Sequence, residues 1–226
     1  MANKYVIKFT KNGYAKYTSH LDLLRFFKRA FRKSKIALSY SQGFNPHPKL
    51  GFAQPLSLGY SSSCELLEFT TDIVYETEDV YEKLRDMMPE GLELLWCREL
   101  DDNIKSLASI AEWAKYNVHI PATFDSNKLR LLVDEYMAKD EIIAMKRQKK
   151  SKELVPVDIK KMIRSFEASI EDEGTELNII LDCGSVSNCS PELVISTFCQ
   201  FASIDVPRYT IEVDRQELGF YNNLQF

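Results

Sequence analysis

Residues Ser19 to Lys33 read SHLDLLRFFKRAFRK and predict the first helix of the chain, which we expect to run to about Ser34. Ser19 is a typical N-cap, and Asp22 three residues later completes a capping-box pattern. At about 100° per residue, apolar side chains fall on one side of this helix and cations on the other. The apolar set is Leu23, Leu24, Phe26, Phe27, Ala30 and Phe31, and the cationic set is Arg25, Lys28, Arg29, Arg32 and Lys33.

The segments around this helix predict a strand, a helix, two strands, a helix and a strand. Residues 5–9 alternate as in a strand, and a turn at 11–13 leads to residues 14–18, which could extend or pair with it. The later elements are extended segments near 36–41, 50–56 and 66–71, a helix at 78–88 capped by Thr77, and a strand at 92–98. The order β-α-β-β-α-β is the ferredoxin-like arrangement.

The same order is expected again after a linker or connecting helix at residues 101–111. Its elements are a strand at 116–120, a helix at 126–139, a hairpin of 142–146 with a segment within 155–170, a strand at 177–183, a helix after Ser190 and a strand at 209–213. Pro191 suits the first position of that helix, because its backbone lacks the N–H that has no helical partner there. We therefore predict an α+β protein of two ferredoxin-like domains in tandem, at residues 1–106 and 107–226.

The charge of the chain is unevenly distributed. The first sixty residues carry eleven Lys or Arg and one acid, Asp22, which gives +10. The whole chain carries −4, so the other 166 residues sum to −14. A basic segment of this kind indicates an anionic partner, and a nucleic-acid backbone is the one we expect. The alternative is an ordinary solvated surface, although such surfaces usually mix charges of both signs.

Composition excludes several other classes of protein. No apolar run resembles a signal peptide or reaches the ~20 residues of a membrane span, so we expect a cytoplasmic protein without a membrane partner. The five cysteines are scattered and fit no zinc or iron–sulfur spacing, which favours reduced thiols and no metal. Glycine-rich phosphate loops are missing, so we expect no cofactor.

The segment SQGFNPHPK, residues 41–49, combines polar groups with rigid backbone. Gly43 permits a tight turn or close approach, and the two prolines stiffen the chain around His47. The groups that could contact bases, sugars or phosphates are Gln42, Gly43, Phe44, Asn45 and Lys49, with Phe44 able to stack on a base. The alternative is a proline-fixed hairpin whose polar groups cap its own backbone.

Two further sets of residues are candidates. His20 and His47 both flank the basic face and could act as acid and base, although a lone histidine such as His20 can also pack at the edge of a core. A second basic cluster comprises Lys146, Arg147, Lys149 and Lys150, with more cations beyond it. This cluster is either a solvated hairpin tip or a second phosphate-contacting arm. Tyr14, Tyr17 and Tyr40 add aromatic rings near the first cluster.

The N-terminal motifs resemble the radical-SAM-linked protein family, a bacterial domain of unknown function. The motifs are YTSHLDLLR at 17–25, RAFR at 29–32, LSYSQGFNPHPKL at 38–50 and the segment 53–59 with Pro55. The resemblance is dense over residues 4–72 and returns at 155–159. The family often has Arg-Pro before its last helix, where this chain has Ser190-Pro191.

The resemblance implies a role beside a radical-SAM enzyme, encoded separately or fused in relatives, and family genes tend to neighbour ribosomal-protein and RNA-processing genes. This chain has no Cys-x-x-x-Cys-x-x-Cys motif, so it is not that enzyme. A more distant likeness is to the CRISPR repeat-processing RAMP endoribonucleases, which also pair ferredoxin-like domains and can place a histidine near the first helix.

Three hypotheses follow. In the first, the chain is a non-catalytic accessory protein that binds an RNA, either tRNA or rRNA. It works with a radical-SAM enzyme that modifies or processes this RNA. In the second, it is a metal-independent endoribonuclease with His20 and His47 as acid and base. In the third, its cationic face docks an acidic protein.

Overall fold

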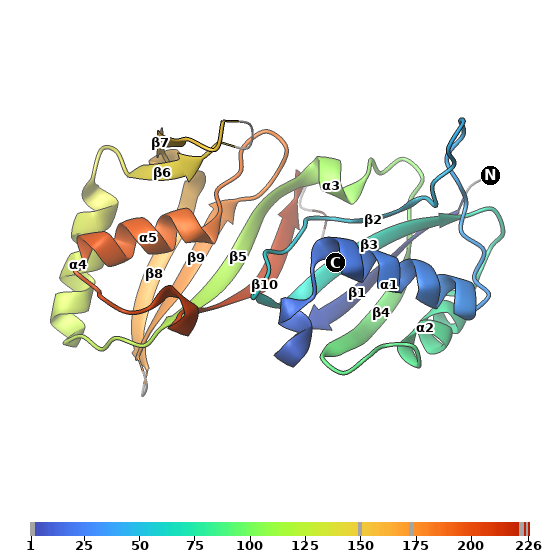
Figure 1. Cartoon of the computed structure of the whole chain (residues 1–226), viewed down its shortest axis with the longest axis horizontal. Helices are drawn as coiled ribbons and strands as arrows, with labels where there is room; N and C mark the ends of the chain where they lie inside the picture. The colour runs from blue at the N-terminus through green and yellow to red at the C-terminus, as the bar shows by residue number, and fades with distance from the viewer. Residues whose placement is uncertain (1–2, 149–150, 172–173, 222–223, 225) are drawn as a thin grey trace. The chain divides into compact units, whose positions relative to one another are not determined.

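The computed structural model describes residues 3–148, 151–171, 174–221, 224 and 226 (Figure 1). The chain divides into two compact units. The first comprises Met1–Ala111 and Gly219–Phe226, and the second comprises Glu112–Leu218. Each unit combines a sheet with helices, so the fold class is α+β. No helix among the described residues is both long and apolar enough to cross a membrane.

The first unit contains most of the elements expected from its sequence. They are β1 (Asn3–Lys11), η1 (Gly13–Tyr17), α1 (His20–Lys33), β2 (Leu50–Phe52), β3 (Ser61–Thr71), α2 (Thr77–Arg85), β4 (Leu92–Leu100) and α3 (Leu107–Ile110). β1 pairs with β4 on one side and β3 on the other, and β2 pairs with β3. All three pairings are antiparallel, which gives the order β4-β1-β3-β2.

The core of the first unit lies between this sheet and the helices α1 and α2. Tyr5, Ile7 and Phe9 alternate along β1 and are buried in this core. The ring of Phe9 lies 5.0 Å from that of Phe27, and the ring of Phe31 lies 4.6 Å from that of Phe69, measured between centroids. Leu24 and Phe26 are partly buried against the same core. The predicted apolar side of α1 is confirmed.

One local prediction for this unit was wrong, and another was met only in part. Residues 14–17 lie in the 3-10 helix η1 and Thr18 is its C-cap, so this segment does not extend β1. The N–H of Ala15 donates to the carbonyl of the N-cap residue, Asn12, at 3.0 Å. Gly13 starts this turn with a positive φ of 52°. Residues 36–41, expected as an extended segment, form isolated bridges from Leu38 to Thr71 and from Tyr40 to Pro48 but no continuous strand.

Residues 101–111, expected as a linker or connecting helix, contain the short helix α3 and are attached to the first unit. The Lys4 ammonium donates hydrogen bonds to the carbonyls of Asp102 and Ile104, at 2.9 and 2.8 Å. The N–H of Leu107 donates to the Glu68 carboxylate at 3.0 Å, and the Leu107 side chain is fully buried. Burial raises the pKa of Glu68. These contacts explain why the first unit continues beyond the boundary expected at residue 106.

The second unit shows a comparable arrangement with an added hairpin. Its elements are β5 (Ala111–Ile120), α4 (Ser126–Ala138), β6 (Ile143–Arg147), β7 (Leu154–Asp158), η2 (Lys160–Met162), β8 (Ile163–Glu171), β9 (Gly174–Asp182), α5 (Pro191–Phe201), η3 (Arg208–Thr210) and β10 (Glu212–Phe220). The sheet order is β10-β5-β9-β8, while β6 and β7 pair only with each other among the described strands.

The expected hairpin at 142–146 is confirmed, with β7 as its second strand. The strand β8 was missed, because the sequence pattern placed a single strand within residues 155–170. The last strand begins at Glu212, and Tyr209 lies in η3. The core of this unit is centred on Tyr136, whose ring lies 5.3 Å from Phe166 and 5.3 Å from Phe198 between centroids.

Gly91, just before β4, marks a close approach of two backbones in the first unit. Its φ is +85°, and the N–H of Asn12 donates to its carbonyl at 2.7 Å. A Cβ at this position would lie 2.5 Å from the Asn12 carbonyl oxygen and 2.9 Å from the Ala15 Cβ. Gly59 has nearly the same φ, +86°, but no atom within 4 Å of an added Cβ.

We expect Gly91→Ala to lower the free energy of unfolding by about 3 kcal/mol, because backbone strain and overpacking add. Gly59→Ala is the matched control and should cost only about 1 kcal/mol, from the strain alone. Urea denaturation followed by circular dichroism measures both. Equal losses in the two variants would contradict the close packing of η1 on Gly91.

Candidate functional site

Ser19 caps the start of α1 as the sequence predicts, but only half of the capping box forms, because the Asp22 carboxylate bonds to the Ser19 hydroxyl and not to its backbone N–H. The N–H of Asp22 donates to the Ser19 hydroxyl at 3.2 Å, and that hydroxyl donates to the Asp22 carboxylate at 2.7 Å. Arg25 donates to the other carboxylate oxygen at 2.8 Å. The Ser19 hydrogen bond and the Arg25 guanidinium lower the pKa of Asp22. Asp22 therefore stays ionised at neutral pH and offsets the charge of Arg25, the first of the predicted cations.

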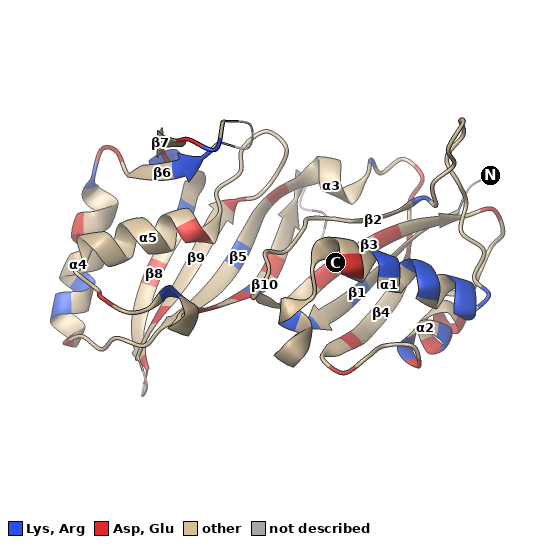
Figure 2. Ribbon diagram, in the orientation of Figure 1, with Lys and Arg blue, Asp and Glu red and all other residues tan. Residues whose placement is uncertain are grey.

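The remaining cations of α1 have no such counter-charge. Lys28, Arg29, Arg32 and Lys33 form no ion pair with any described residue. Figure 2 shows the resulting pattern, a red band at the start of α1 followed by blue bands toward its end. Arg29, Arg32 and Lys33 are exposed, and Lys28 is half-buried. The excess positive charge therefore lies on the C-terminal half of the helix.

α1 ends in a Schellman motif that contains a lysine. The N–H of Ile36 donates to the Phe31 carbonyl at 3.1 Å, and the N–H of Lys35 donates to the Arg32 carbonyl at 3.3 Å. Lys35 adopts a positive φ of 60°. Glycine usually occupies this position, because a Cβ costs about 1–2 kcal/mol in the left-handed region. The strained residue, Lys35, adds a fifth cation beside the end of α1.

A groove of about 480 Å³ opens at this end of α1. Three cations line it, Lys28, Arg32 and Lys35, together with Phe31, Ile36, Ala37, Leu38, Tyr40 and Pro48. One set of lining groups is cationic and the other is apolar or aromatic. The groove thus brings the predicted basic helix together with the two residues at the base of the 41–49 segment, Tyr40 and Pro48.

The 41–49 segment is a projecting loop with a closed base (Figure 1, near the N label). The N–H of Ser41 donates to the His47 carbonyl at 2.8 Å, and the N–H of His47 donates to the Ser41 hydroxyl at 3.0 Å. Gly43 has a φ of 132°, which favours glycine. Residues 42–46 extend beyond this base, and the side chain of Phe44 is fully exposed.

Three of the polar side chains of this loop do not cap its backbone. Gln42, Asn45 and His47 make no side-chain hydrogen bond to any described residue. Only the Ser41 hydroxyl performs the capping role that the alternative interpretation assigned to them. The loop therefore offers two amides and an imidazole to solvent.

The structure shows no contact between His20 and His47 among the described residues. The ring of His20 packs edge-on against Phe52, 5.1 Å between centroids, at the end of β2. His47 lies five residues before Phe52 in the chain, where its carbonyl closes the base of the 41–49 loop. A pair that transfers protons at one phosphate must place both imidazoles within reach of the same reacting atoms.

Lys49 also lies outside the groove. Successive side chains of an extended chain point to opposite sides, so the side chains of Lys49 and Pro48 lie on opposite sides of this segment. Lys49 lines a separate cavity of about 280 Å³, together with Lys4 and Glu68. It remains a predicted contact for an anion but belongs to a different surface.

The second basic cluster is described only in part. Lys146 and Arg147 are exposed on β6, and the Arg147 guanidinium donates to the carbonyl of Lys152 at 3.0 Å. Lys149 and Lys150 lie outside the described residues. No group of His, Cys, Asp and Glu that could hold a metal ion is found among the described residues.

The fold and site thus define an α+β protein with a cationic groove beside an exposed polar loop. The chain belongs to the family described as "Uncharacterized protein conserved in bacteria (DUF2344)", whose model matches residues 4–191. That description assigns no activity. No curated protein matches the chain.

The comparison with solved structures finds matches that include the following two. One is a chain of the "Crystal Structure of a Cbf5-Nop10-Gar1 Complex", with a TM-score of 0.53 and 13% identity, covering 95% of this chain and 49% of that one. This chain therefore spans about half the length of its neighbour, and the likeness shows the fold alone. The other is an unknown protein from Galdieria sulphuraria, with a TM-score of 0.29, 8% identity and coverage of 95% and 98%. That score carries no argument.

Sequence reasoning missed Lys35 and Pro48 and noted Tyr40 only as a nearby aromatic. The pattern of α1 ends at Lys33, and a lysine in a left-handed C-terminal cap has no sequence signature. Pro48 was assigned only a stiffening role. The family motif at residues 38–50 contains both Tyr40 and Pro48, and this motif could have indicated that these two residues belong to one site.

We expect Lys35→Gly to raise the free energy of unfolding by about 0.5–1 kcal/mol. Glycine removes the strain at positive φ. It also gives the unfolded chain more backbone freedom, which offsets part of this stabilisation. Lys35→Ala is the control, because alanine keeps the Cβ and should give no stabilisation. Thermal denaturation of both variants measures the difference, and a gain in Lys35→Ala equal to that in Lys35→Gly would contradict the strain.

Proposed function

We propose that the chain binds RNA through the groove side of its first unit. Lys28, Arg29, Arg32, Lys33 and Lys35 contact phosphates, and the loop at 42–47 contacts bases or a bent backbone. The observation that carries this proposal is the groove itself, in which three cations without ion partners among the described residues share a surface with an aromatic ring.

A purely structural role explains only part of this charge. Cations in the last turn of a helix interact favourably with the helix dipole, which accounts for Arg32 and Lys33. It does not account for Arg29, which lies before the last turn, or for a strained lysine at position 35. Like charges at helical spacing repel one another, and a polyanion relieves that repulsion. With about four phosphates contacted, log Kd should change with log salt with a slope of roughly 3.

An acidic protein is the alternative partner for a cationic face. The groove favours RNA because its apolar and aromatic side suits the flat face of a base. The carboxylates of an acidic protein would need only the cations and not this apolar side. The endoribonuclease hypothesis lacks the support of geometry, since His20 packs on Phe52 and His47 stands on the loop. We therefore propose binding without cleavage.

The resemblance of residues 4–72 to the radical-SAM-linked protein family supports a more specific role. We propose that the chain presents bound RNA, tRNA or rRNA, to a radical-SAM enzyme that modifies or processes it. The radical chemistry would belong to that enzyme, because the cysteines of this chain lack the cluster-binding spacing.

The strand orders support the ferredoxin-like part of the fold prediction. The order β4-β1-β3-β2 joins the elements of the first unit as β-α-β-β-α-β, with antiparallel pairings throughout. The order β10-β5-β9-β8 is equivalent once the β6–β7 hairpin is treated as an insertion. We propose that both units are ferredoxin-like, and the likeness to RAMP proteins remains an analogy of fold.

We expect Arg32→Glu to weaken RNA binding by roughly tenfold, about the worth of one charge-assisted hydrogen bond. The slope of log Kd against log salt should fall by about 1, since one phosphate contact is lost. Fluorescence anisotropy with labelled tRNA across a salt series measures both quantities.

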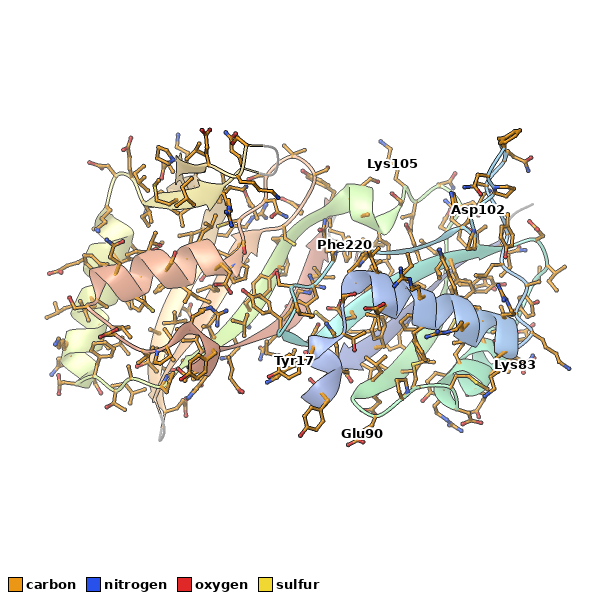
Figure 3. All side chains as sticks on the ribbon, viewed as in Figure 1. Tyr17, Lys83, Glu90, Asp102, Lys105 and Phe220 are labelled. Atoms are coloured by element: carbon orange, nitrogen blue, oxygen red, sulfur yellow. The ribbon has the colours of Figure 1, made fainter. Side chains whose placement is uncertain are left out.

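Lys105→Glu is the matched control, because it reverses one exposed lysine of the same unit on the segment anchored by Lys4, away from α1 (Figure 3). The control should keep the affinity and slope of the unaltered chain. If Arg32→Glu changes neither quantity, or if both variants change them equally, the proposed RNA-binding surface is wrong. Tight binding of an acidic protein without RNA binding would favour the alternative partner.

A further inference from the structure

The two kinds of groups that line the groove match the two parts of a nucleotide. Lys28, Arg32 and Lys35 supply cations for a phosphate, while Tyr40 and Pro48 supply apolar surface for a base. The volume of about 480 Å³ lies in the range of pockets that hold small ligands, about 300–1,000 Å³. We propose that the groove receives one unpaired nucleotide, so that the site takes single-stranded RNA in preference to duplex. This inference rests on the proposed function.

The position of Tyr40 supports an unpaired base. The backbone of Tyr40 is bridged to Pro48, and the next residue, Ser41, is hydrogen-bonded to His47. The ring therefore stands on a fixed base and makes no ring contact with a described residue, and Tyr40 as a whole is 52% exposed. In a duplex both faces of each base are covered by its neighbours, so only an unstacked base can lie against such a ring.

Phe44 supplies a second aromatic surface. Its side chain is fully exposed at the tip of the loop whose base is formed by Tyr40 and Pro48. Exposing a phenylalanine forgoes about 1.5–3 kcal/mol of burial, so a partner that covers the ring gains that energy. A strand with one base on Tyr40 can place a neighbouring base on Phe44, beside the amides of Gln42 and Asn45.

A free nucleotide has the same chemistry as a nucleotide within a strand. The exposed cations on α1 outside the groove, Arg29 and Lys33, favour the strand, because one nucleotide in the groove cannot neutralise them. Uridine monophosphate and inorganic phosphate serve as competitors to separate these sources. We expect uridine monophosphate to displace a bound strand only at concentrations far above the Kd of that strand.

The test compares a short labelled oligo-uridine strand with a blunt RNA hairpin whose loop is a polyethylene glycol linker, so that the hairpin has no unpaired nucleotide. Both carry the same number of phosphates and are measured at the same salt concentration. The unaltered chain should bind the strand at least about tenfold more tightly. Tyr40→Ala should weaken strand binding by about 5- to 100-fold, the range for one base–aromatic stack. It should leave hairpin binding and the salt slope unchanged, since no phosphate contact is lost.

Two further variants keep this test specific. Tyr40→Phe retains the ring and should bind the strand as the unaltered chain does. Tyr14→Ala removes a tyrosine that is 88% exposed on η1, outside the groove, and should have no effect. Fluorescence of a strand containing 2-aminopurine provides an independent readout, because stacking on Tyr40 quenches it and Tyr40→Ala should restore it.

The outcomes separate this inference from the proposed function. If the strand and the hairpin bind with equal affinity and the salt slope is unchanged, the inference that the groove receives an unpaired nucleotide is wrong. The proposal that the cationic face binds RNA would still stand. Equal losses in Tyr40→Ala and Tyr14→Ala would also overturn the groove as the site. If uridine monophosphate displaces the strand with a Kd comparable to that of the strand, the ligand of the groove is a free nucleotide. No binding of either RNA would remove both proposals.

Discussion

The packing of Phe27 and Phe31 of α1 on the sheet of the first unit is the contact on which the candidate site depends. With ring centroids 5.0 Å from Phe9 and 4.6 Å from Phe69, these two side chains fix the rotation of the helix about its axis. Because helical side chains are spaced by about 100°, that rotation directs Arg29, Arg32 and Lys33 to solvent. The same packing places the C-terminal end of α1 beside residues 36–40 and so forms the groove.

Periodicity predicted the elements whose side chains follow a regular face, and it failed where the backbone leaves regular geometry. The apolar and cationic sides of α1, its Ser19 cap and the alternation of β1 were all predictable from residue spacing. The η1 turn, the left-handed Lys35 and the missed strand β8 depend on tertiary contacts or on positive φ, which single-sequence patterns do not record. The groove itself could not be predicted, because it joins residues 28–40 to Pro48 across a loop.

The candidate site differs from the predicted one in a way that has a physical cause. The prediction treated Arg25 as equal to the other cations, but the Asp22 carboxylate beside it offsets its charge. It grouped His20 with His47 because both flank the basic face, whereas His20 packs on Phe52 of β2 and His47 is exposed on the loop before β2. Lys49 turns to another cavity because it follows Pro48 in an extended chain. What remains is smaller and more specific, namely the C-terminal half of α1, Tyr40 and the loop that follows.

The central claim is that RNA contacts this part of the first unit. Ultraviolet crosslinking of the unaltered chain to bound RNA, followed by mass spectrometry of the digested complex, identifies the residues that touch bases most directly. The account predicts crosslinked peptides that contain Tyr40 and Phe44. Crosslinks confined to other peptides, such as those of the β6–β7 hairpin, would contradict it.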